Sequence, residues 1–168
     1  MKAHHLEGVW TYVTYEVCGV RRQPESLAKL ANLVLLGWEY VPGWDGLWAV
    51  VIFGYDGNKW TDQQIKSACR KGILGDDKVD EPSACDIYIY AGGGFRVALE
   101  KSPNEIDWQQ FCDGAPQIPM NLGIFALNQD RLTLCMGFEG RPRPSRFSST
   151  ERPHQDLGEL TREPRTES

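Results

Sequence analysis

The chain has 168 residues, 41% of them hydrophobic, with six each of Trp, Tyr and Phe, a composition typical of one globular domain. Its net charge is −5 and its basic residues are dispersed, which argues against a surface that binds nucleic acid. No apolar run approaches the ~18 residues of a membrane-spanning helix, so we expect no membrane partner.

The first structural signal is a strand over Gly8–Cys18, a stretch rich in β-branched and aromatic residues. Simple alternation places Trp10 and Tyr12 on one face of this strand, and Val13 and Tyr15 on the other. One of these two sets is expected to face the core. The residues before the strand lack the apolar stretch of a secretory signal, which favours a cytoplasmic location.

Residues 23–36, QPESLAKLANLVLL, predict a short helix with Pro24 near its start. The spacing of Leu27, Leu30 and Ala31 gives that helix one apolar side, which could pack against a sheet. We therefore expect the helical content of the chain to lie in its first half.

Residues 37–55 predict two strands joined by a turn at Pro42-Gly43. Three of the six tryptophans, Trp38, Trp44 and Trp48, cluster in this segment. These indoles either belong to an ordinary core or form an aromatic lid over a hydrophobic ligand, since ligand pockets are mostly apolar. On the second interpretation all three are ligand-binding residues.

Residues 84–100 predict a hairpin whose turn is Gly92-Gly93-Gly94. The glycines do not form a phosphate-binding loop, because neither Lys-Ser nor Lys-Thr nor a helix start follows them. Each predicted strand has an apolar face and a polar or phenolic face. Together with the first strand, these polar faces supply further candidate ligand-binding residues: Tyr12, Tyr88, Tyr90 and Arg96.

Residues 121–136 give the clearest strand signal, with two apolar segments joined by the polar turn Asn128-Gln129-Asp130. The second strand is expected to end before Gly140 and Pro142, because glycine weakens a strand and proline lacks an N–H group. Beyond Ser149 the sequence is polar and interrupted by prolines. We therefore expect one domain over residues 1–149 and a flexible tail over residues 150–168.

No catalytic triad is legible, because the three histidines lie near the chain ends and no G-x-S-x-G occurs. Asp107, beside Trp108, is either an acid whose pKa is raised by apolar surroundings or a carboxylate that caps a turn. Cys135 is expected to be a small buried filler rather than a nucleophile. The weak catalytic candidates are Asp107, Tyr88 and Tyr90.

The five cysteines are an odd number and include no C-x-x-C pair, which predicts free thiols rather than a disulfide framework. The same spacing argues against a zinc site. The sequence also contains no cofactor motif, so we expect neither a cofactor nor a metal.

Four motifs, taken together and in this order, resemble an uncharacterised bacterial lipocalin-like family. They are L-x-G-x-W in Leu6–Trp10, K-x-P-x-x-I-D in Lys101–Asp107, G-I-F-x-L-x-x-D-x-L-x-L-C in Gly123–Cys135 and R-P-x-x-F in Arg143–Phe147. Residues 23–84 depart from the family pattern. The resemblance implies an all-β fold, an antiparallel lipocalin-like barrel of about eight strands with one or two short helices. It implies no established activity.

The resemblance also implies a specific contact inside such a barrel. Arg143 is expected to stack on the Trp10 indole, similar to the tryptophan and arginine pairing of lipocalins. This contact would be structural.

Three functions fit this sequence. The first is binding of a small hydrophobic or aromatic molecule in a barrel cavity. The second is a cofactor-independent isomerase or cyclase that acts on a biosynthetic intermediate in the same cavity by acid–base chemistry. The third is a protein-interaction module that presents its aromatic hairpin. A buried titratable residue that reaches the cavity would favour catalysis over carriage.

Overall fold

The structure is a computed structural model that describes residues 3–22, 32–36, 47–53, 88–112, 115–116, 119–138 and 140–164. These residues form one 3-10 helix and ten strands: η1 (Ala3–Leu6), β1 (Gly8–Val17), β2 (Val20–Arg21), β3 (Asn32–Leu36), β4 (Leu47–Phe53), β5 (Tyr88–Ala98), β6 (Asn104–Cys112), β7 (Ala115–Pro116), β8 (Asn121–Asn128), β9 (Arg131–Gly137) and β10 (Gln155–Arg162). The predicted all-β class is confirmed. Within these ranges no helix is long and apolar enough to cross a membrane.

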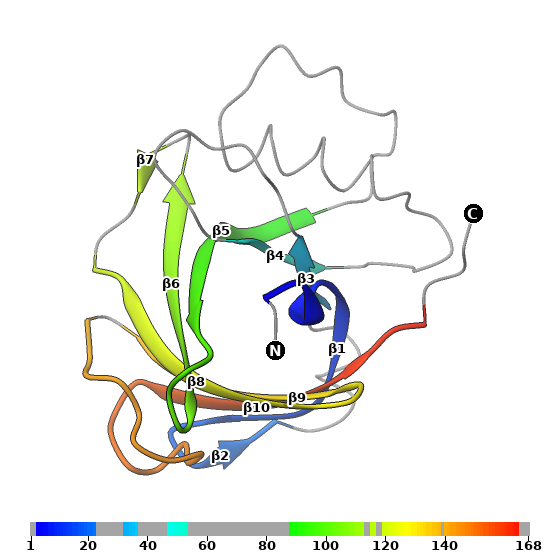
Figure 1. The fold of residues 1–168 in the computed structure, drawn as a ribbon. Coiled ribbons are helices and arrows are strands. Elements are labelled where there is room, and N and C mark those ends of the chain that lie inside the picture. The colour runs from blue at the N-terminus through cyan, green and yellow to red at the C-terminus, as the bar shows by residue number, and fades with distance from the viewer. Residues whose placement is uncertain are drawn as a thin grey trace.

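All strand pairings are antiparallel, and the sheet order is β10-β9-β8-β6-β5-β4-β3-β1-β2, with β7 beside β6 (Figure 1). Strand β1 pairs with β3 through Gly8–Trp10 and with β10 through Trp10–Val17. Strand β1 therefore has a paired neighbour on each of its edges. The first and last strands of the sequence lie side by side.

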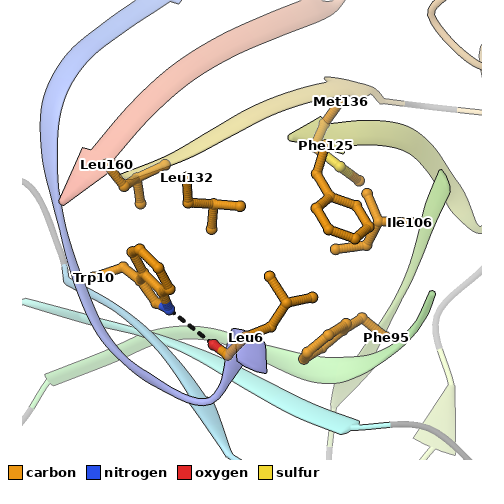
Figure 2. Close-up of a cluster of buried hydrophobic side chains, with 8 residues drawn as sticks. All are labelled: Leu6, Trp10, Phe95, Ile106, Phe125, Leu132, Met136 and Leu160. Atoms are coloured by element: carbon orange, nitrogen blue, oxygen red, sulfur yellow. Dashed lines mark hydrogen bonds between the residues drawn. The ribbon is translucent and has the colours of Figure 1, made fainter. Parts of the chain in front are cut away.

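The core lies on one side of this sheet. Eight buried hydrophobic side chains, contributed by η1 and by six strands, point toward one another in Figure 2. They are Leu6, Trp10, Phe95, Ile106, Phe125, Leu132, Met136 and Leu160. Because directly opposed residues of an antiparallel pair share a face, the register around these eight residues shows which other side chains face the core.

Trp10 anchors η1 to the sheet. Its side chain is 0% exposed, and its indole N–H donates to the Leu6 carbonyl at 2.9 Å (Figure 2). The guanidinium of Arg162 lies 4.4 Å from the centre of the Trp10 ring, within reach of a cation–π contact. Arg162 also donates to the backbone carbonyls of Glu7 and His5. The predicted stacking of Arg143 on Trp10 is therefore wrong, since the partner arginine comes from β10.

The other side of the sheet is covered in part by the segment between β9 and β10. Cys135 and Gln155 are buried on this side, where Gln155 donates to the Ser148 carbonyl and, at 3.5 Å, to the Cys135 sulfur. The Cys135 thiol donates to the Ser148 carbonyl at 3.4 Å, and burial raises its pKa. The prediction that Cys135 is a buried filler is confirmed.

Two predictions of local structure are wrong. The helix predicted over residues 23–36 conflicts with strand β3, which pairs with β4 on one side and with β1 on the other. A short apolar run fits helix and strand equally, and pairing on both edges decides for strand. Residues 23–31 lie outside the described ranges.

The hairpin predicted at Gly92-Gly93-Gly94 is also wrong, because β5 continues through all three glycines. Each pairs with β4 on one side and with β6 on the other. A Cβ atom at Gly93 would lie 2.1 Å from the Gln109 carbonyl oxygen, so glycine is required here by close approach of β6 and not by a turn.

The flexible tail predicted from residue 150 is wrong for β10, which is paired along its whole length with β9 and over most of it with β1. From Gly158 to Thr161 its residues alternate between buried and exposed, with Leu160 in the core and Thr161 exposed. Polar composition concealed this strand, because only one of its faces contacts the core.

We predict that Trp10→Ala lowers the free energy of unfolding by about 3–5 kcal/mol, since it removes a fully buried aromatic side chain and leaves a cavity. Thermal and urea melts measure the loss. Trp10→Phe retains most of the apolar contact but removes the donor to Leu6, so it should be destabilised less. Equal stability of Trp10→Ala and the parent would contradict the anchoring role.

A second pair of variants tests whether β10 belongs to the folded unit. Leu160→Ala should cost about 2–5 kcal/mol, because Leu160 is 1% exposed in the core. Thr161→Ala, one residue along on the exposed face, should change stability by less than about 0.5 kcal/mol. Similar small effects in urea unfolding of both variants would mean that β10 does not contribute to the core.

Candidate functional site

A bulge in β1 changes which of its side chains face the core. Tyr12 is opposite Leu160, but Thr14 is opposite Glu159, so Val13 has no counterpart in β10. Val13 is 56% exposed. A residue inserted in one strand shifts the alternation beyond it, which places Tyr15 on the same side as Tyr12. The predicted alternation, which separated these two tyrosines, is wrong beyond Tyr12.

Tyr12 lies over a glycine of the neighbouring strand. A Cβ atom at Gly158 would lie 2.8 Å from Cε1 of Tyr12, so the absence of a side chain makes room for the ring. The rings of Tyr12 and Tyr15 meet edge to face, with centroids 5.3 Å apart and planes at 68°. Such a geometry places the positive edge of one ring against the negative face of the other.

Asp156 of β10 is the third residue beside Tyr12 and Tyr15. It is opposite Met136 in β9 and Val17 in β1, so its side chain lies on the core-facing side. The hydroxyl of Tyr15 donates a hydrogen bond to Oδ2 of Asp156. Tyr12, Tyr15 and Asp156 are half-buried and form what we call the Tyr–Asp site.

Burial dominates the electrostatics of the Tyr–Asp site. It raises the pKa of Tyr12 to about 12, with a further contribution from the charge of Asp156. It also raises the pKa of Tyr15, helped by the hydrogen bond to Asp156 and by the charge of that carboxylate. Both phenols are therefore neutral near pH 7 and can donate hydrogen bonds.

The carboxyl group of Asp156 is also perturbed by burial, which raises its pKa. Three groups act in the opposite direction and favour the carboxylate: the hydrogen bond from Tyr15 and the positive charges of Arg22 and His154. Their combined effect is smaller than the desolvation, because the net shift remains upward. The surroundings therefore offset only part of the cost of desolvating the Asp156 carboxylate.

The surroundings of the Tyr–Asp site on the core side are apolar. Met136 and Leu160 belong to the core cluster, and Tyr12, Leu134 and Phe138 pack against it. The site therefore joins a hydrophobic surface to a phenol pair and one carboxylate. Chemically it can hold an apolar body, donate and accept hydrogen bonds, and exchange a proton.

The structure separates the residues predicted to bind a ligand. Tyr12 belongs to the Tyr–Asp site. Arg96 is exposed on the side of β5 opposite to the core residue Phe95, so it is not brought together with Tyr12. The side chains of Tyr88, Tyr90 and Trp48 lie outside the described residues, although β5 and β4 contain these positions. Trp38 and Trp44 lie outside them entirely.

Asp107, the first catalytic candidate, lies in β6 on the side away from the core, directly opposite Arg96. Its Oδ1 atom accepts a hydrogen bond from Nη2 of Arg143 at 2.6 Å. Nε of Arg143 lies 3.6 Å from Oε2 of Glu105, and Nη1 donates to the carbonyls of Ile106 and Gly123. Asp107 does not cap a turn. It fixes the segment after β9 against β6 and β8, which is a structural role.

Sequence reasoning missed Tyr15 and Asp156. Tyr15 was missed because of the bulge at Val13. A bulge depends on the pairing with the partner strand, so the sequence of β1 alone does not reveal it. The prediction of a flexible tail concealed Asp156. A weak signal was present in β10, where Leu157 and Leu160 interrupt an otherwise polar run.

A separate pocket of about 350 Å³ lies where β1 begins and β10 ends. Its lining is mostly charged and consists of Glu7, Gly8, Asp130, Arg162, Glu163 and Pro164. Arg162 is 3.2 Å from Asp130, and Glu163 accepts a hydrogen bond from Thr11, so these charged groups already contact protein partners. Within the described part of the chain, no group of three or more His, Cys, Asp or Glu residues could hold a metal ion.

Comparisons of the chain with protein-family models, curated proteins and solved structures find no match.

The raised pKa of Asp156 gives a prediction for stability. A carboxyl group whose pKa is higher in the folded than in the unfolded state favours folding below its unfolded pKa, and this advantage is lost as pH rises through the folded pKa. Asp156→Asn keeps an oxygen acceptor for Tyr15 but has no charge to desolvate. Its melting temperature should equal or exceed that of the parent near neutral pH and fall less steeply between acidic and neutral pH.

Thermal melts across that pH range provide the measurement. Glu159→Gln is the matched control, because it removes a carboxylate from the exposed face of the same strand. Parallel pH profiles for the parent and Asp156→Asn would mean that Asp156 is not desolvated.

Proposed function

We propose that the chain forms a lipocalin-like barrel which binds a small hydrophobic or aromatic molecule, and that the Tyr–Asp site holds the polar end of this ligand. The observation that carries the proposal is the hydrogen-bonded pair of Tyr15 and Asp156, half-buried on the core-facing side of the sheet. Small-molecule sites combine an apolar lining with a few placed polar groups.

Two features support the barrel. Strand β1 pairs with both β3 and β10, as a strand in a closed sheet would. Helix η1 contributes Leu6 to the core cluster beside Trp10, so packed apolar side chains occupy the interior next to the start of β1. A ligand would then enter from the other end, toward which Tyr15 and Asp156 lie along their strands.

A purely structural role explains the Tyr–Asp site less well. A hydrogen bond between Tyr15 and Asp156 does connect β1 to β10, but the two strands are already paired along the backbone. An apolar cross-strand pair would connect them without desolvating a carboxylate, and replacing buried charged pairs by apolar residues is often neutral or stabilising. Perturbed titratable groups on apolar surfaces are characteristic of functional sites.

The alternative is an enzyme, a cofactor-independent isomerase or cyclase that works in the same cavity. The observation that favours it is the pairing of a carboxyl group of raised pKa with a neutral phenol, since these can accept and donate a proton on one substrate. The two functions share their residues and differ in whether the bound molecule is changed. Recovery of the ligand unaltered after incubation would exclude the enzyme for that ligand.

The proposed location is the cytoplasm. The free thiols of Cys18 and Cys135 support it, because reducing compartments keep cysteines unpaired.

A fluorescence titration with N-phenyl-1-naphthylamine tests the binding function. This probe is neutral, aromatic and fluorescent in apolar surroundings, and its N–H group could donate to Asp156. We expect a saturable increase in emission with the parent. Tyr15→Phe and Asp156→Asn should each weaken binding by about 0.5–1.5 kcal/mol, the net contribution of one hydrogen bond.

Thr14→Val is the matched control, because Thr14 lies in the same strand but contacts Glu159 on the exposed side. It should bind the probe like the parent. Trp44→Ala, in the same titration, tests the predicted aromatic lid and should weaken binding by about 1–3 kcal/mol without a matching loss of melting temperature. Absence of a saturable signal with the parent would contradict the binding function.

A further inference from the structure

Resting on the small-molecule binding proposed above, we infer that the Tyr–Asp site selects ligands whose polar end is a protonated primary amine. Asp156 would form the ion pair with this ammonium group, and Tyr12 and Tyr15 would contact it with their rings and hydroxyl oxygens. The inference concerns the class of ligand, which the apolar lining alone does not specify.

The first argument is the hydrogen-bonding capacity of Asp156. A carboxylate has two oxygens and about four acceptor positions, and the hydroxyl of Tyr15 occupies one position at Oδ2. The carboxylate can accept further donors. An ammonium group carries three N–H donors and no acceptor, so it matches a site whose principal polar group accepts.

The second argument is charge. Arg22 and His154 are exposed residues that act on Asp156 from the ends of neighbouring segments, and their charges do not offset its desolvation. The residues opposite Asp156 are the apolar Val17 on β1 and Met136 on β9, and the phenols of Tyr12 and Tyr15 beside it are neutral. Within this described environment, a cationic ligand would supply the compensating charge at close range.

The third argument is the pair of rings. Tyr12 and Tyr15 stand edge to face at 5.3 Å, so they present ring surfaces in two orientations beside one carboxylate. Aromatic faces attract cations through the ring quadrupole, and this attraction increases when the cation is desolvated. A carboxylate ligand would instead meet repulsion from Asp156. The same three residues thus favour an ammonium group over an anionic group.

Three probes with one apolar body test this selectivity: 4-phenylbutylamine, 4-phenylbutan-1-ol and 4-phenylbutanoic acid. Binding is measured at neutral pH by calorimetry and by displacement of N-phenyl-1-naphthylamine from the parent protein. We expect the amine to bind about tenfold or more tightly than the alcohol, as for a charge-assisted contact, and the acid to bind most weakly.

Asp156→Asn should remove the preference for the amine, and the affinity for the alcohol should fall only by about two- to tenfold, as for the loss of one neutral hydrogen bond, because the apolar contacts persist. Glu159→Gln removes the same charge from the exposed face of β10 and should keep the full preference. The parent provides an independent measurement, since acidification that protonates Asp156 should reduce amine binding while the amine stays charged.

The outcomes separate the two proposals. Equal binding of amine and alcohol by the parent overturns the amine inference and leaves small-molecule binding in place. A preference that persists in Asp156→Asn and at acidic pH also overturns it, because another group must then hold the amine. Failure of the parent to bind either compound or the fluorescent probe overturns both the inference and the proposed function.

Discussion

The structure depends on the pairing of β10 with both β1 and β9. This pairing joins the two ends of the sequence and places Arg162 over Trp10, whose indole in turn fixes η1. It also brings Asp156 beside Tyr15. The core anchor and the Tyr–Asp site therefore both depend on the interface between β1 and β10, in which each residue pair is separated by more than a hundred positions in the sequence. Such long-range contacts order much of the chain at once, and they cannot form until it has largely collapsed.

The two sides of the sheet place charge in different ways. On the side away from the core, Arg143 meets Asp107 and Glu105 in a cluster that retains partial contact with solvent. Its guanidinium also satisfies two backbone carbonyls, so every charge has a partner. On the core-facing side the carboxylate of Asp156 has a phenol as its hydrogen-bond donor, and burial still raises its pKa. The first arrangement stabilises a segment, whereas the second retains a carboxyl group on the core-facing side at a cost in desolvation.

The sequence was sufficient for elements whose signals are local. Strand β1 and the β8–β9 hairpin follow from alternation and from a polar turn, and the buried Cys135 follows from its place in that hairpin. The sequence was insufficient where pairing with another strand determines the local structure. The glycines of β5 permit close approach of β6 instead of a turn, and β3 is a strand because both of its edges are paired. Trp10 was correctly predicted to take part in a cation–π contact, but the resemblance implied Arg143 as its partner, and the structure places Arg162 of β10 there instead.

The Tyr–Asp site shows why four motifs could predict an all-β fold without revealing the candidate site. None of its three residues lies in a motif, and two of them meet only because Val13 is an extra residue in β1. With regular pairing beyond Tyr12, Tyr15 would be opposite Leu157, whose own partner in β9 is Cys135, on the side away from the core. Asp156 would then remain on the core-facing side without its phenol. A chain with the same motifs but no bulge could therefore keep the sheet and the Trp10 anchor and yet lack the hydrogen-bonded pair, so the bulge and not the motifs determines whether Tyr15 meets Asp156.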